Sequence, residues 1–164
     1  MTPIPEGAPQ TLSEAFAHIN ALTAPSVTDL KVMVLIEAAG QTLYEVSAEG
    51  ADHEGVKALL IENGHEEMKH AGRVSAAIKL LSGEEFPPPS AAENPYLTGH
   101  IPRATLTAEG LKKTAEAEFA GDVLYATWAE SLDNADAAAL LRLNGQEETD
   151  HGNRLLQAAT LLEV

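Results

Sequence analysis

The chain has 164 residues, a length that suits one domain with a core large enough to fold without disulfide bonds. Hydrophobic residues make up 45% of it, aromatic residues only 4%, and there is no cysteine, so the core must be aliphatic and disulfides, thiolate metal sites and catalytic thiols are excluded. Such a composition favours packed helices over sheets. The formal net charge of −15 repels phosphate backbones and anionic lipid, which argues against nucleic acid or a membrane as partner.

Residues 1–25 form an N-terminal extension ahead of the main repeat. The first ten residues are rich in proline and lack the basic flank and apolar centre of a secretory signal. No window approaches the roughly 18 consecutive apolar residues of a membrane span, so we expect a soluble, cytoplasmic protein. Residues 11–23 could form a short extra helix.

The rest of the chain is an internal duplication. Residues 26–83 and 107–164 align at a constant offset of 81 without a gap, and 22 of 58 positions are identical. The densest matches are Glu37-x-Ala39-Gly40-x-x-Leu43-Tyr44 with Glu118-x-Ala120-Gly121-x-x-Leu124-Tyr125, and Asn63-Gly64-x-Glu66-Glu67-x-x-His70-x-x-Arg73 with Asn144-Gly145-x-Glu147-Glu148-x-x-His151-x-x-Arg154.

Each copy has the three-to-four spacing of apolar residues that predicts a pair of amphipathic helices. In the first copy we expect helices over 27–50 and 54–81, and in the second over 108–131 and 135–162. Asp52 and Asp133 are equivalent in the repeat and fall in the two short turns, where each could cap the helix that follows.

A proline-rich segment, residues 82–106, joins the two hairpins. It contains five prolines and cannot be helical over most of its length. Its residues could extend to roughly 80 Å, about twice the length of one long helix, so it can cross the whole bundle. We therefore predict an all-α fold: a four-helix bundle over residues 26–164, made of hairpin 26–83, crossover 82–106 and hairpin 107–164, the hairpins related by a pseudo-two-fold axis.

Two pairs of glutamates lie at equal distances from the hairpin turns. Glu37 and Glu67 are equidistant from the first turn, and Glu118 and Glu148 from the second, so all four side chains reach the same height near mid-helix. A histidine follows one helical turn after the second glutamate of each pair. The six candidate metal ligands are thus Glu37, Glu67, His70, Glu118, Glu148 and His151.

Four buried carboxylates without partners would cost many kcal/mol or become protonated, whereas two divalent cations cancel their charge. Carboxylate oxygens with one imidazole per ion suit iron or manganese better than zinc. Glu62 and His65 have the same spacing as a ligand pair, but Leu143 and Gln146 replace them in the second copy. Glu116 is assigned to solvent or to the surroundings of the site, since its repeat partner is a leucine.

Further residues recur around the candidate ligands. Tyr44 and Tyr125 lie two turns past a ligand glutamate, where each could hydrogen-bond a carboxylate of the facing helix or take part in redox chemistry. Gly40 and Gly121 lie on the inner face, for tight helix packing or to leave space over the metals. Three further predictions are that Asn63 and Asn144 hold a ligand imidazole, that Arg73 and Arg154 pair with Glu66 and Glu147 or with carboxylates near the site, and that Trp128 serves packing.

These motifs resemble the ferritin-like di-iron carboxylate superfamily, and within it rubrerythrin-like and bacterioferritin-like proteins. The resemblance covers about residues 26–164 and implies the six ligands above, with Glu67 and Glu148 as bridging carboxylates. The chain departs from classical rubrerythrins because it lacks the cysteine-rich rubredoxin module and has Gly121 where they carry a further carboxylate. Because it stops at the end of the fourth helix, we also expect no 24-subunit shell.

The resemblance implies a di-iron oxidoreductase that reduces peroxide or activates dioxygen, holds two iron ions (iron with manganese, or manganese alone, being open) and takes electrons from an external donor. Three alternatives remain: ferroxidation, iron storage or metal buffering; an organic-substrate oxidase or hydroxylase, which needs an apolar pocket near Gly40 or Gly121; and a structural bundle holding zinc or nothing. A homodimer is compatible with the internal symmetry.

Overall fold

The computed structural model describes residues 1–99, 101 and 105–163, and over these it contains five α-helices, one short 3₁₀ helix and no strand. The predicted all-α class is confirmed, and the four long helices start and end within one residue of their predicted bounds. Residues 100, 102–104 and 164, in the predicted crossover and at the end of the second hairpin, lie outside the described part. The elements are α1 (Leu12–Asn20), α2 (Val27–Glu49), α3 (Glu54–Ser82), η1 (Pro95–Leu97), α4 (Ala108–Glu130) and α5 (Ala135–Leu162).

Side chains at the helix starts fix where α1 and α2 begin. The Asp29 amide donates to Ser26 Oγ at 3.2 Å, and the Asp29 carboxylate accepts from the Ser26 amide at 2.8 Å. Thr11 and Glu14 form the same reciprocal pair at the start of α1. Each pair satisfies amides that the first helical turn leaves free. The short helix expected within residues 11–23 is therefore present.

The predicted caps of the second helix in each hairpin were wrong by one residue. The N-cap of α3 is His53, whose Nδ1 accepts from the Gly55 amide at 3.1 Å, and the N-cap of α5 is Asn134, whose Oδ1 accepts from the Ala137 amide at 2.9 Å. Both residues have extended backbones directly before the helix, the position from which a side chain reaches the free amides. Asp52 and Asp133 stand one residue too early and are exposed.

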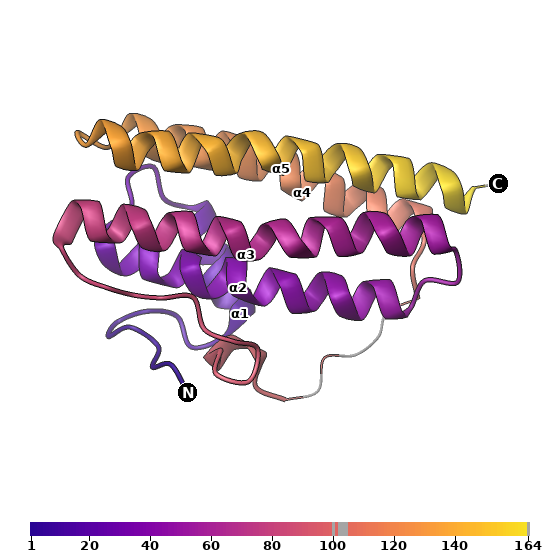
Figure 1. Cartoon of the computed structure of the whole chain (residues 1–164), viewed down its shortest axis with the longest axis horizontal. Coiled ribbons are helices and arrows are strands. Elements are labelled where there is room, and N and C mark those ends of the chain that lie inside the picture. Colours follow the sequence, from indigo (N-terminus) through magenta and orange to yellow (C-terminus); the bar gives the residue numbers. More distant parts are fainter. Residues whose placement is uncertain (100, 102–104, 164) are drawn as a thin grey trace.

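The four long helices form a bundle of two hairpins, α2 with α3 and α4 with α5 (Figure 1). α3 packs against α5 across the hairpins, and α1 lies against α2. α4 starts at the end of the bundle where α3 also starts (Figure 1). The segment between α3 and α4 therefore joins opposite ends of the bundle, as the long-crossover prediction requires. Asn94 fastens the crossover to α2, because its Nδ2 donates to the Leu35 carbonyl at 2.8 Å.

The buried apolar side chains form two clusters, one toward each end of the bundle. The first surrounds Leu30 and Trp128, whose indole nitrogen donates to the Leu22 carbonyl at 3.1 Å, and the second surrounds Leu60 and Leu155. Trp128 is fully buried, in agreement with its predicted packing role. The buried glutamates and histidines lie between the two clusters.

Candidate metal centre

The middle of the bundle gathers acidic and imidazole side chains from all four long helices. Only 4% of Glu37, 6% of Glu67 and 5% of Glu148 is exposed, and both histidines are fully buried. Glu67, His70, Glu148 and His151 each offer one candidate ligand atom, and these four atoms lie within 4.8 Å of one another. The duplicated Glu-x-x-His turns of α3 and α5 therefore meet at one point, as the repeat predicts.

Each imidazole is oriented by a carboxylate of the other hairpin. Nε2 of His70 lies 3.0 Å from Glu147 Oε2, and Nε2 of His151 lies 3.1 Å from Glu66 Oε2. An ionised carboxylate only accepts hydrogen bonds, so each Nε2 must carry the proton that it donates. In the neutral ring the lone pair is then on Nδ1, the nitrogen that points into the centre.

The two Nδ1 atoms are buried and have no hydrogen-bond partner among the described residues. Nδ1 of His70 lies 3.2 Å from Glu148 Oε1 and 3.7 Å from Glu37 Oε2, and Nδ1 of His151 lies 3.1 Å from Glu67 Oε1 and 3.4 Å from Glu148 Oε2. The rings stack with centroids 5.0 Å apart. Unpartnered nitrogens facing carboxylate oxygens form a donor set that fits divalent cations.

Arginines complete the support behind the histidines. Arg73 donates to both oxygens of Glu147, at 2.6 and 3.0 Å, and its charge helps to hold the pKa of Glu147 below the usual range. Arg154 donates to one oxygen of Glu66 across the hairpins, and its other nitrogens donate to Asn63 Oδ1 at 2.6 Å and to Glu62 Oε1 at 3.2 Å. Both arginines thus pair with the two predicted glutamates, but the pairs cross between the hairpins, Arg73 with Glu147 and Arg154 with Glu66.

The prediction that Asn63 and Asn144 hold the imidazoles was wrong. Their amides donate to the backbone carbonyls of the histidines instead, from Asn63 to His151 at 3.3 Å and from Asn144 to His70 at 3.1 Å. Both asparagines are fully buried between α3 and α5, where the neighbouring backbone is within reach. They therefore join the two hairpins, while the adjacent carboxylates hold the rings.

Glu66 and Glu147 are the members of the candidate site that the sequence did not identify. Sequence patterns placed them only in ion pairs, whereas the structure makes them the acceptors that orient His151 and His70. The available signal was their recurrence beside a ligand glutamate in both copies. Its meaning depended on α3 packing against α5, which the repeat alone does not specify.

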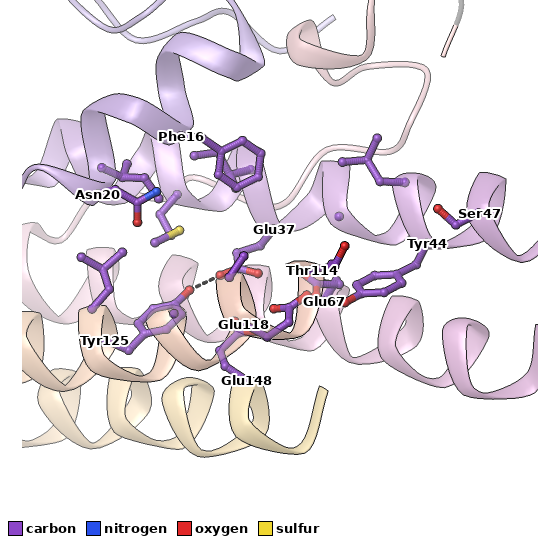
Figure 2. A pocket seen from close by; sticks show the side chains of 18 residues that line it. Phe16, Asn20, Glu37, Tyr44, Ser47, Glu67, Thr114, Glu118, Tyr125 and Glu148 are labelled. Atoms are coloured by element: carbon purple, nitrogen blue, oxygen red, sulfur yellow. Dashed lines mark hydrogen bonds between the residues drawn. The ribbon is translucent and has the colours of Figure 1, made fainter. Parts of the chain in front are cut away.

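The two tyrosines hold carboxylates of the opposite hairpin. Tyr44 of α2 donates to Glu118 Oε1 of α4, and Tyr125 of α4 donates to Glu37 Oε1 of α2, as drawn for Tyr125 in Figure 2. Burial and the neighbouring carboxylates raise the pKa of both tyrosines. The hydroxyls therefore stay protonated and serve as donors, which confirms the hydrogen-bonding prediction.

The pKa values reflect carboxylates crowded in a buried space. Burial raises the pKa of Glu67 and Glu118, and the charges of nearby glutamates add to the effect. Burial opposes ionisation of Glu148 too, but the two imidazoles outweigh it and lower that pKa. Burial also opposes the charge of His70, yet the carboxylates of Glu148 and Glu37 raise its pKa to about 10. Protons thus offset part of the acidic charge in the metal-free protein.

Two glycines lie where carboxylates approach α2 and α4. A Cβ added at Gly40 would lie 2.5 Å from Glu67 Oε2 and would displace that carboxylate, and one at Gly121 would lie 3.3 Å from Glu148 Cγ, a tighter contact than usual. Both glycines thus leave room for a candidate ligand carboxylate from the other helix of the same hairpin. Glu116 is exposed, as expected.

Four antiparallel helices with carboxylates and Glu-x-x-His turns directed inward define a ferritin-like bundle with a candidate dinuclear metal site. The Rubrerythrin family model matches residues 30–159, and the chain belongs to this family. No curated protein matches the chain, and no solved structure does either. Among the described helices, none is both long and apolar enough to cross a membrane.

Proposed function

We propose that this chain is a di-iron oxidoreductase that reduces hydrogen peroxide or activates dioxygen. The proposal is supported above all by the two buried Nδ1 atoms that lack hydrogen-bond partners and face carboxylates. Membership of the Rubrerythrin family supports the same class of site. The proposed ligands are Glu37, Glu67, His70, Glu118, Glu148 and His151, with Glu67 and Glu148 bridging.

Charge and donor type favour two divalent ions of iron or manganese, and we propose iron. Two divalent cations balance four carboxylates, and each Arg–Glu pair behind a histidine is already neutral. Oxygen donors with one imidazole per ion suit iron or manganese. Iron would supply the redox chemistry, alternating between its ferrous and ferric states while electrons arrive from an external donor.

The chain's own residues prepare the site. Glu66 and Glu147 keep the proton on Nε2 of each imidazole, which leaves Nδ1 free to bind. Tyr44 and Tyr125 hold Glu118 and Glu37 in place through donated hydrogen bonds.

Anaerobic loading with ferrous iron, followed by stopped-flow mixing with peroxide or dioxygen, tests the proposal. We expect two irons per chain and a near-ultraviolet absorption change, faster with the physiological oxidant. Glu118→Gln should lose the change, and Glu116→Gln, at an exposed position on the same helix, should keep it. Two bound irons with no response to either oxidant would contradict the redox role. Iron uptake far beyond two per chain would favour storage, and size-exclusion chromatography of the same sample tests the predicted homodimer.

A further inference from the structure

A cavity of about 280 Å³ lies directly over the carboxylates, between α1, α2 and α4 (Figure 2). Four glutamates and the two tyrosines line its inner end. This volume is nearly twice that of the roughly 150 Å³ cavity that holds a benzene molecule. Most of the lining surface is apolar, and the side walls are formed by Ile19, Met33, Ile36, Leu43 and Leu124.

The cavity opens on only one side of the centre. α3 and α5 pack closely behind the histidines, whereas α2 and α4 make no comparably close contact over the described residues. The rim consists of exposed side chains on two helices, namely Phe16 and Asn20 on α1 and Thr114 and Ala117 on α4. A small molecule can therefore reach the candidate centre from the α1 side.

The two repeats have diverged where the cavity opens. Met33 and Ile36 of α2 correspond to Thr114 and Ala117 of α4, so the second copy has smaller side chains at the equivalent positions. Their replacement by Met and Ile would narrow the rim. The wall formed by α1 also precedes residues 30–159, so this part of the cavity lies outside the family match.

The lining indicates the charge of the molecule that fits. The glutamates at the inner end repel an anion, a cationic group would have to compete with the proposed metal ions for the same carboxylates, and the apolar walls offer a charge no other partner. At the rim, Asn20 and Thr114 offer hydrogen bonds to a single small polar group. These features suit an uncharged, largely apolar molecule with little polar surface.

We propose that this cavity binds an uncharged, mainly apolar organic molecule about the size of two fused aromatic rings, and holds it against the metal centre. The binding site is defined by the cavity itself, whereas a role for the bound molecule as substrate rests on the proposed function. Binding and metal content are therefore measured separately.

Isothermal titration of the full-length protein with 2-naphthol, both metal-free and zinc-loaded, tests the proposal. We expect one molecule per chain in both forms and binding of 2-naphthalenesulfonate weaker by about tenfold or more. Leu124→Trp should fill the cavity and weaken 2-naphthol binding by about tenfold or more, whereas Val123→Trp should leave it within about twofold. Val123 is the neighbouring residue, is 67% exposed and does not line the cavity.

If circular dichroism shows that Leu124→Trp does not fold, a second pair of variants tests the same cavity. Ala117→Leu narrows the rim and should weaken binding, while Ala120→Leu changes an exposed alanine of α4 outside the lining and should not.

The proposal is overturned if 2-naphthol does not bind or if the sulfonate binds with equal affinity. It is also overturned if the two variants of each pair have equal effects on binding. If 2-naphthol binds but the protein takes up no metal, the proposed function fails and the cavity site stands. If metal binds but 2-naphthol does not, the cavity proposal fails and the proposed function stands.

Discussion

The imidazole of each candidate ligand is fixed by a chain of three side chains that crosses to the opposite hairpin and returns. His70 bonds Glu147, and Glu147 bonds the guanidinium of Arg73, which returns to the helix of His70. The carboxylate therefore has two roles, holding the ring in one orientation and stabilising the proton on Nε2. Groups of this kind usually contribute strongly to metal affinity although they never touch the metal.

Glu147→Gln should weaken metal binding by roughly 10- to 100-fold. The amide has no charge to stabilise the Nε2 proton, and it presents Arg73 with a donor as well as an acceptor. Competition titration against a coloured chelator measures the affinity. Glu116→Gln removes a carboxylate from an exposed position and should change nothing; equal affinities for the two variants would show that the contact to His70 does not matter.

Gly40→Ala should impair the centre with little loss of stability. The new methyl group would lie 2.5 Å from Glu67 Oε2 and must displace that carboxylate, while alanine favours the helix by about 1 kcal/mol. Metal titration and thermal unfolding separate the two effects. Gly72→Ala on α3 has open space around it, so it should raise stability and leave metal binding as it was. Unchanged affinity in Gly40→Ala would mean that Glu67 is not a ligand.

At the residue scale, the sequence predicts well what repeats and poorly what depends on the neighbouring helix. The proximity of Glu67, His70, Glu148 and His151 was predictable because both copies carry them at one height, and their role as ligands stays a prediction. The acceptor of each imidazole was misassigned to asparagine, because Asn63 and Glu66 lie one turn apart and only the packing of α3 on α5 decides which reaches the ring.

Among the elements, the starts of α3 and α5 decide the geometry of each hairpin turn. Asn134 caps α5 through the Ala137 amide, and Asp133 does not. Asn134→Ala should lower the free energy of unfolding by about 1 kcal/mol, and Asp133→Ala should change it by less than about 0.5 kcal/mol. Chemical denaturation of the metal-free protein measures both. The opposite order of effects would restore the cap predicted from sequence.

The long helices were predictable because apolar periodicity, capping residues and the proline-rich crossover all mark their ends. α1 was also expected, but its position was not. A nine-residue helix can pack in several places, and the sequence does not specify the tertiary packing of α1 on α2. This contact makes Phe16 part of the cavity rim. The pocket that an organic-substrate alternative requires near Gly40 and Gly121 therefore emerged only from the structure.

For the molecule as a whole, the acidic centre separates two apolar clusters and makes stability depend on what neutralises it. In the metal-free protein, protons are the available neutralising charge. Burial and nearby carboxylates raise the pKa of Glu67 and Glu118, and the pKa of His70 is raised from 6.5 to about 10. Metal binding must displace these protons.

The metal-free protein should lose stability as the pH rises. A group whose pKa is higher in the folded than in the unfolded chain stabilises the fold fully below its unfolded pKa, and this contribution is lost as the pH passes the folded pKa. For His70 the window runs from 6.5 to about 10. We expect Tm to fall across it by on the order of 10–20 °C.

Metal loading should flatten this pH profile, because cations replace the protons as neutralising charge. Addition of metal to an unbuffered sample at neutral pH should also release protons, which a pH-stat records. A metal-free Tm that rises with pH, or metal uptake without proton release, would contradict the account.

The hydrogen bonds that span the hairpins also impose an order on assembly during synthesis. Glu66 and Glu147 have their described partners on the opposite hairpin, so these contacts form only when α5 has docked on α3. A nascent chain that has emerged only as far as α3 holds one Glu-x-x-His turn with an unrestrained ring, a weak and unselective ligand pair. We therefore expect tight metal binding only after α5 has been synthesised and has docked, so the incomplete chain should not retain a wrong ion.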